Sequence, residues 1–360
     1  MHFKKGYLSK FRIPVVPALF LFIFNVHAKT DIPVFLLTGQ SNMSGYASAN
    51  DLTADQKATV PNVKIYCDMT WENNGKLRKW LTLGPGFGSS SNNIGPELAM
   101  GRKLSEELPD TKIAFLKICC GSTYLGLKSS SPNDCWVPPS SNNGTAGAHY
   151  KRMLASIETA MKSFNSAFDT TEYTPRWAGF VWLQGEFDGQ DRSLADAYEK
   201  NLTNLINDVR KDLDIDDLPF IIPMIDVQSS WQFNAQVRAA EIAVTKMENV
   251  DTLDTKGFET DGVHYRAQGQ WKVGTISAQR WLDMDYQYSP PVVISFDRTA
   301  TPAVRPQTLQ QESYSLFDLS GKKLTTSPAM RLDMLPANGV LVVSPDDKTA
   351  KGRCMTKVRK

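Results

Sequence analysis

The sequence predicts an α/β fold in which helices cover both faces of a parallel sheet. Short β-rich apolar runs alternate with longer stretches of helical periodicity between residues 33 and 283. Several of the short runs are apolar throughout, which is typical of strands buried on both sides. After about Asp285 the chain becomes rich in proline. These observations indicate one large α/β domain followed by a smaller unit.

The predicted elements follow from the two periodicities. Strands are expected at the short apolar runs Val34–Leu37, Val63–Tyr66, Ile113–Ile118, Ala178–Leu183 and Phe220–Met224. Helices are expected where apolar residues recur three and four positions apart, at Glu97–Leu108, Tyr150–Phe164, Leu194–Leu213, Asn234–Met247 and Ala267–Leu282. The α/β domain therefore spans residues 29–285.

The first 28 residues have the organisation of a signal peptide. Four cationic residues precede the apolar run Val15–Val26, and Ala28 closes a small-residue cleavage site. The run is short for a membrane span, although an uncleaved anchor is the alternative. We therefore expect a secreted or cell-surface protein whose mature form begins near Lys29 and has no membrane span.

The mature chain is close to neutral. Residues 1–28 carry four cations and no acids, so removing them changes the formal net charge from +2 to −2. No basic stripe of the kind that binds nucleic-acid phosphates is present. We expect a largely uncharged partner and no nucleic acid.

Five cysteines in an exported chain allow one or two disulfides. The expected pair joins Cys119 or Cys120 to Cys135, because the segment between them is rich in Ser, Pro and Asn. Buried free thiols are the alternative. No CxxC pair indicates zinc, and no metal site is expected.

The C-terminal part is expected to form a linker at residues 286–306 and a small β-rich module at residues 307–360. The linker contains repeated prolines. Short strands are expected at Ser313–Leu319, Gly321–Leu324 and Val340–Val343, joined by Ser-Gly and Asn-Gly turns.

The first predicted strand runs directly into GQSNM at residues 39–43, which places Ser41 at the carboxyl end of a strand. Ligands bind at that edge of open α/β sheets. A serine nucleophile needs a base, and histidine serves at neutral pH. His2 and His27 belong to the signal peptide, so His149 and His264 remain.

His264 is the expected base because Asp261 precedes it by three residues. That spacing lets the carboxylate orient the imidazole while the other ring nitrogen faces the serine. His149 lacks a nearby carboxylate and is expected to be structural or to face substrate. Oxyanion donors are expected at CCGST, residues 119–123, and at Gln184, where two further strands end.

Four motifs in this order resemble the SGNH hydrolase superfamily, and within it carbohydrate esterase family 6 and the sialate O-acetylesterase domain. They are GQSNM at 39–43, the glycine of CGST at 120–123, WLQGEFD at 182–188 and DGVH at 261–264. The resemblance spans roughly residues 31–283. It implies a flavodoxin-like three-layer α/β/α fold, deacetylation of a plant polysaccharide such as acetylated xylan, and no cofactor.

The resemblance also implies residue roles. Ser41 matches the nucleophile, His264 the base and Asp261 the acid. Gly121 and Gln184 match the oxyanion hole together with the Ser41 N–H. Glu186 matches a family-specific acid that orients His264 in place of Asp261 or beside it. Cys120 stands where a second glycine is more usual.

Three side chains are expected to contact substrate: Gln40, Asn42 and Trp136, the last because it lies in a loop at the strand ends. Asp188 and Asp191 are alternatively calcium ligands, although the full loop pattern is missing. The C-terminal module resembles in outline the sorting tails of some Gram-negative polymer degraders, and a carbohydrate-binding accessory is the alternative.

The expected function is removal of acetyl groups from an acetylated polysaccharide by a serine esterase. A sialate O-acetylesterase shares the same motifs. A non-catalytic carbohydrate-binding protein on a hydrolase scaffold is the alternative from a different class.

Overall fold

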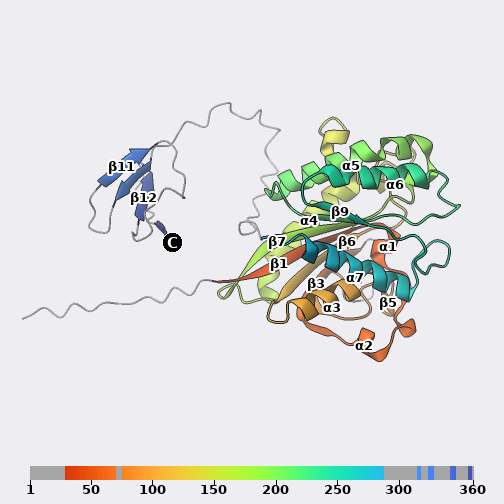
Figure 1. Cartoon of the computed structure of the whole chain (residues 1–360), viewed down its shortest axis with the longest axis horizontal. Helices are drawn as coiled ribbons and strands as arrows, with labels where there is room; N and C mark the ends of the chain where they lie inside the picture. The colour runs from red at the N-terminus through yellow and green to blue at the C-terminus, as the bar shows by residue number, and fades with distance from the viewer. Residues whose placement is uncertain are drawn as a thin grey trace, which may run out of the picture. The chain divides into compact units, whose positions relative to one another are not determined.

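The computed structural model describes residues 29–69 and 75–287, together with the backbone of four short strands between residues 314 and 358 (Figure 1). The expected signal peptide, Cys354 and nearly all of the expected linker lie outside the described residues. The chain divides into two compact units, Met1–Ser295 and Phe296–Lys360. Within the described residues, no helix combines the length and the apolar character needed to cross a membrane.

The first unit is built on a seven-stranded sheet in the order β4-β3-β6-β1-β7-β8-β9. The strands are β1 (Thr30–Gly39), β3 (Val60–Met69), β4 (Trp80–Leu83), β6 (Ile113–Cys119), β7 (Tyr173–Leu183), β8 (Phe220–Pro223) and β9 (Val250–Leu253). All neighbours are parallel except β4, which runs antiparallel to β3. The predicted mostly parallel α/β sheet is therefore confirmed, whereas β4 and β9 were not predicted.

The strand order places three loops together. Leaving out β3 and β4, the strands β6-β1-β7-β8-β9 follow the flavodoxin order, in which the first strand lies between the second and third. Gly39 at the end of β1 pairs with Cys119 of β6 and with Leu183 of β7. The segments that begin at Gln40, Cys120 and Gln184 consequently leave the sheet side by side.

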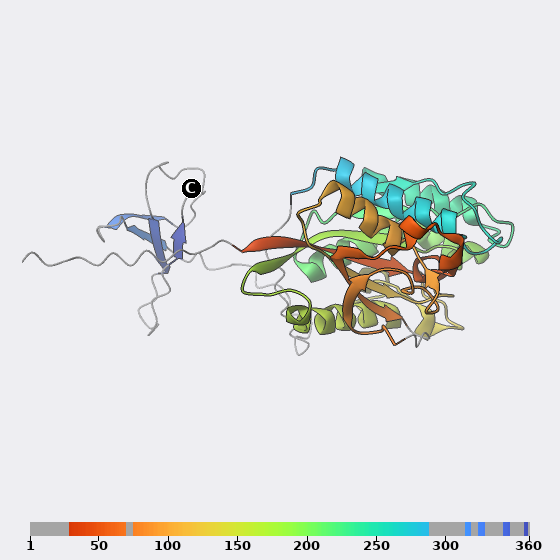
Figure 2. The same cartoon turned by 90° about the horizontal axis from the view of Figure 1, so that it is seen from below.

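Helices cover both faces of the sheet (Figures 1 and 2). The first face carries α4 (Ala148–Lys162), α5 (Arg192–Leu213) and α6 (Asn234–Ala243), and the second carries α3 (Glu97–Glu107) and α7 (Ala267–Asp283). Side chains of β1 alternate between the two cores: Leu36 packs with the first group and Phe35 with the second. The five predicted helices are thereby confirmed, and α6 ends earlier than predicted because a 3-10 turn, Val244–Lys246, follows it.

Short elements complete the second face. They are α1 (Ser41–Ser44), α2 (Ala54–Lys57) and a small antiparallel pair, β2 (Ala47–Ser48) and β5 (Asn93–Ile94).

The N-terminus of the long α5 is capped by Asp191, whose Oδ1 accepts the N–H of Ser193 at 2.9 Å.

The second unit contains a four-stranded antiparallel sheet in the order β11-β10-β12-β13. Its strands are β10 (Tyr314–Phe317), β11 (Lys323–Ser327), β12 (Leu341–Pro345) and β13 (Thr356–Val358). The first three overlap the strands expected from the sequence.

The expected disulfide does not form. Cys67, Cys119, Cys120 and Cys135 are all buried free thiols. The Cys135 thiol donates to the carbonyl of Ser131 at 3.3 Å. The loop is held by backbone bonds instead, because Tyr124 donates to Asp134 at 2.9 Å and accepts from Trp136 at 2.8 Å.

Candidate active site

Ser41 begins α1 directly after β1 and is buried, with 8% of the residue exposed. The preceding turn requires glycine at residue 39. Gly39 has a φ of 144°, and a Cβ there would lie 2.0 Å from the carbonyl oxygen of Leu183. Close approach of β1 to β7 therefore fixes where the serine leaves the sheet.

Asn42 connects Ser41 to the segment around His264. Its Nδ2 donates to Glu186 Oε1 at 2.7 Å and to the carbonyl of Val263 at 3.3 Å, and its Oδ1 accepts the N–H of Tyr265 at 3.0 Å. Both neighbours of His264 are thus bound to the residue after Ser41. Asn42 is 2% exposed and its amide is fully used inside the protein, so the expected substrate contact is not what the structure shows.

The imidazole of His264 stacks on Tyr46, with ring centroids 4.4 Å apart and planes 9° from parallel. Burial lowers the pKa of His264, and the nearby Asp261 carboxylate opposes this shift. The imidazole of His264 therefore stays neutral to lower pH than an exposed histidine.

Asp261 shapes the turn before His264. Its Oδ1 accepts the N–H of Val263 at 2.9 Å and of His264 at 2.7 Å. Among the described residues, no hydrogen bond joins this carboxylate to the imidazole ring. Asp261 therefore interacts with His264 through the backbone N–H and through its charge.

Glu186 is 1% exposed and reaches His264 only through Asn42. Burial raises the pKa of Glu186 to about 7, against the opposing effect of the Asn42 hydrogen bond. Its Oε2 is buried and has no hydrogen-bond partner within the described part of the chain.

Gln184 lies wholly inside the protein, with no exposed surface. Its Nε2 is within hydrogen-bond distance of three acceptors: Asp188 Oδ2 at 2.8 Å, the Thr123 carbonyl at 2.9 Å and Gln40 Oε1 at 3.2 Å. The expected oxyanion donor is therefore already engaged, because an amide nitrogen carries only two hydrogens.

In Gln40 it is the side-chain oxygen, rather than the nitrogen, that is engaged in a hydrogen bond. Its Oε1 accepts from Gln184, which directs its Nε2 away from that residue. In the described part of the chain this nitrogen has no acceptor, and it is absent from the fully buried atoms that lack partners. Gln40 is 1% exposed, and its Nε2 is the side-chain donor next to Ser41 in the sequence.

Asp188 fixes the loop that contains Gly121. Its carboxylate accepts the N–H of Leu125 at 2.8 Å and of Gly126 at 3.0 Å. Burial raises the pKa of Asp188 to about 6. Because Asp191 caps α5 and pairs with Lys128, the two aspartates serve separate structural roles. No cluster of three or more metal-ligating side chains occurs among the described residues.

Trp136 does not face substrate, which corrects the expectation. The residue has no exposed surface, its ring packs against Trp182 with centroids 5.5 Å apart, and its Nε1 donates to Thr123 Oγ1 at 2.8 Å. His149 lies beside Trp136 and is 6% exposed. Burial lowers the pKa of His149 to about 4, so this histidine is neutral at neutral pH.

A buried ion pair supports α1, and sequence reasoning missed it. Lys117 in β6 and Glu97 in α3 are fully buried and 2.7 Å apart. The Lys117 ammonium also donates to the carbonyls of Ser44 at 2.9 Å and Phe87 at 2.8 Å. Burial disfavours this charge, but Glu97 together with Cys119 and Cys67 raises the pKa of Lys117 overall. A single lysine in the apolar run IAFLKIC is the signal that was available.

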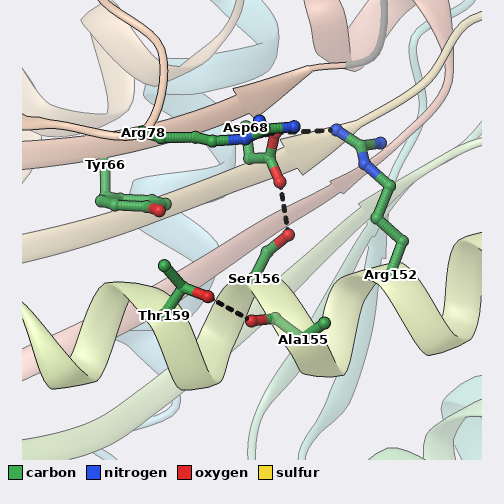
Figure 3. A pocket seen from close by; sticks show the side chains of 7 residues that line it. All are labelled: Tyr66, Asp68, Arg78, Arg152, Ala155, Ser156 and Thr159. Carbon is green, nitrogen blue, oxygen red and sulfur yellow. Dashed lines mark hydrogen bonds and ion pairs between the residues drawn. The ribbon is translucent and has the colours of Figure 1, made fainter.

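A pocket of about 390 Å³ lies between β3 and α4 (Figure 3). Asp68 is at its centre, where Arg78 Nε and Arg152 Nη2 each approach the carboxylate to 3.1 Å and the Ser156 hydroxyl donates to it. Burial opposes ionisation, but these contacts lower the pKa of Asp68. The pocket is on β3, two strands from β1, and its charged groups satisfy one another.

Comparisons with known proteins agree with this fold. The chain is 25% identical over 265 residues to a probable carbohydrate esterase of Arabidopsis thaliana, covering 69% of this chain and 90% of that protein. The crystal structure of an Arabidopsis thaliana protein is similar, with a TM-score of 0.54, 21% identity, and coverage of 71% of this chain and 99% of the other. The crystal structure of NanS gives a TM-score of 0.51 at 14% identity, with coverage of 72% and 98%.

The family assignment rests on a match over more than half of the chain. Residues 31–283 match the family described as carbohydrate esterase, sialic acid-specific acetylesterase. This range contains the sheet of the first unit except Thr30, the first residue of β1, and every residue of the site described above. The chain therefore belongs to the carbohydrate esterase, sialic acid-specific acetylesterase family.

Proposed function

We propose that this protein is a serine esterase that removes O-acetyl groups from carbohydrate, with Ser41 as nucleophile and His264 as base. The observation that carries the proposal is the set of bonds made by Asn42, which bind both neighbours of His264 to the residue after Ser41. Membership of a carbohydrate esterase family supports the reaction class.

The reaction proceeds by two acyl transfers. Ser41 Oγ attacks the acetyl carbonyl while His264 takes its proton, and the intermediate expels the sugar alkoxide, which receives that proton. An acetyl group is then bound to Ser41. Water attacks this ester with His264 again acting as base, which releases acetate and restores the serine.

The oxyanion of each intermediate is stabilised by the N–H groups of Ser41 and Gly121, which emerge side by side from β1 and β6. Gln40 supplies a side-chain amide donor. Gln184 supports this arrangement from within, because it holds both Gln40 and the carbonyl of Thr123.

The two acids have different tasks in this proposal. Asp261 sets the backbone of the turn at His264, and its negative charge stabilises the imidazolium formed during attack. Glu186 holds Asn42 and so fixes the segment that carries the base.

Two acetylated sugars are candidate substrates. The sequence motifs favour acetylated xylan, and the family description favours O-acetylated sialic acid. The expected export of the chain agrees with either polymer-bound substrate outside the cell.

The decisive assay compares acetate release from acetylated xylan and from O-acetylated sialic acid by the wild-type protein, S41A and S90A. Ser90 is exposed, so S90A controls for the loss of a hydroxyl group. We expect turnover of one substrate to dominate, complete loss in S41A and no change in S90A. Retained turnover in S41A would contradict the proposal, and binding without turnover in the wild type would favour a binding protein.

A further inference from the structure

Tyr46 is held rigidly relative to Ser41. The intervening Gly45 donates its N–H to the carbonyl of Ser41 at 2.8 Å and accepts the N–H of Ser89 at 2.7 Å. Gly45 has a φ of 86°, and a Cβ there would meet the backbone of Gly95 at 2.3 Å. The aromatic ring therefore follows a turn that requires glycine and is held by two backbone hydrogen bonds.

The rings of Tyr46 and His264 are stacked and nearly parallel. Their ring planes differ by 9° at a centroid separation of 4.4 Å. Tyr46 is 37% exposed, so core packing does not require a ring at this position. A large aromatic side chain that covers one face of the proposed base is available for a role in the reaction.

A stacking contact matters for His264 because few other contacts fix the orientation of its imidazole plane. Rotation of a histidine ring about its last side-chain bond has broad minima. In most Ser-His-Asp triads, a carboxylate bonded to the ring removes this freedom. Here Asp261 Oδ1 bonds the backbone N–H groups of Val263 and His264.

We infer that Tyr46 is a positioning residue whose ring fixes the plane of the His264 imidazole and so aims it at Ser41. The inference rests on the proposed roles of Ser41 and His264. The stacked ring takes over part of the orienting task that a bonded carboxylate performs in other triads. Tyr46 takes no proton and touches no reacting atom in this scheme.

The same ring face also contributes to the environment of the base. Burial lowers the pKa of His264, and Asp261 is the ionisable group that raises it. Removing the ring exposes the imidazole to water, so the pKa of His264 moves up toward its ordinary value of 6.5. Replacing Tyr by Phe retains the flat contact and leaves this pKa unchanged.

The test compares Y46F, Y46L and Y46A with the wild type on a small aryl acetate and on an acetylated sugar. Y46F should retain kcat within about twofold, whereas Y46L and Y46A should lose about tenfold or more in kcat on both substrates with little change in KM. Y46L keeps apolar bulk without a flat ring, and circular dichroism checks that each variant is folded. The rising limb of the pH-rate profile should move to higher pH in Y46L and Y46A only.

Proton NMR of His264 provides a readout that is independent of turnover, with H264A assigning the signals. The ring-current shift from Tyr46 should persist in Y46F and disappear in Y46L and Y46A. A loss confined to KM for the sugar would make Tyr46 a substrate platform and overturn the inference, as would unchanged His264 signals in Y46A. Turnover retained in S41A would refute the proposed function, and the NMR comparison would still report on the stacked contact.

Discussion

The side-chain oxygen of Asn42 accepts the backbone N–H of Tyr265 at 3.0 Å, so the residue after Ser41 is bound to the residue after His264. The same amide donates to the carboxylate of Glu186. One side chain therefore joins the ends of β1 and β7 to the turn before α7. In the proposed mechanism, the placement of Ser41 relative to His264 depends on this amide.

Replacing Asn42 with alanine should lower kcat by about ten- to a hundredfold, because a small misplacement of reacting groups has an effect of that size. The variant leaves the N–H of Tyr265 and the carboxylate of Glu186 without their partner. Steady-state kinetics on an aryl acetate measure the change. N92A removes an exposed asparagine and should be unaffected. Equal activity in N42A and N92A would show that the bonds of Asn42 do not position the base.

Glu186 should make the protein less stable as pH rises from about 4.5 to about 7. Its pKa is 4.5 when unfolded and about 7 when folded, so the folded state binds more protons across this window. The shift corresponds to about 3 kcal/mol of stability, which is present below pH 4.5 and lost above pH 7. Asp188 adds a similar trend at lower pH.

Urea unfolding at pH 5 and pH 8 measures this dependence. E186Q retains an acceptor for Asn42 but has no proton to lose, so the difference in stability between the two pH values should be smaller than in the wild type. E199Q alters an exposed glutamate and should follow the wild type. The assignment fails if E186Q and the wild type show the same difference.

The ratio kcat/KM should fall as pH decreases through a value below 6.5. Burial lowers the pKa of His264, and protonation of the base stops attack by Ser41. His149 has a pKa of about 4 and does not touch the reacting groups, so H149N should keep the wild-type midpoint. If the midpoint of the pH-rate profile moves in H149N, the titrating group is His149, and the assignment to His264 is wrong.

Replacing Lys117 with methionine should destabilise the protein by about 3–5 kcal/mol, because it leaves the buried carboxylate of Glu97 uncompensated. The double variant K117M/E97M removes both charges and should recover part of this loss. K103M breaks an exposed pair with Glu107 and should change stability by less than about 1 kcal/mol. Urea unfolding compares the three. A double variant that is less stable than K117M would contradict the assigned pairing.

The thiols at 67, 119, 120 and 135 should resist modification in the folded protein. Burial raises the pKa of Cys119 to about 11 and that of Cys67 further, so little thiolate is present at neutral pH. A thiol-reactive dye should label these residues only after the protein is unfolded. No reductant is needed for this labelling, because the thiols are not in disulfides. Peptide mapping that finds a disulfide among them would contradict the structure.

The sequence predicted the main fold well because its signals are local. Apolar runs and helical spacing located five strands and five helices. Strand β9 was missed because Val250–Leu253, at an edge of the sheet, has two adjacent polar residues and forms no apolar run. The disulfide prediction was wrong because a polar, proline-rich segment does not reveal backbone pairing. The bonds between Tyr124 and its partners hold that loop.

The surroundings of the candidate site could be predicted only in part, for a related reason. Motifs singled out Ser41 and His264, whose catalytic roles stay predictions, but side-chain direction depends on contacts between distant segments. Trp136 lies in a loop and yet is buried, because its ring packs against Trp182 from β7. Likewise, nothing local to Tyr46 indicates a stack on a histidine more than two hundred residues away.

The most direct test of the central claim is to trap the acyl-enzyme. Wild-type protein is quenched in acid during turnover of an aryl acetate, digested, and analysed by mass spectrometry. We expect one acetyl group on the peptide that contains Ser41, attached at that residue and absent in S41A. Turnover without any acetylated Ser41 peptide, or an acetyl group carried by another residue, would contradict it.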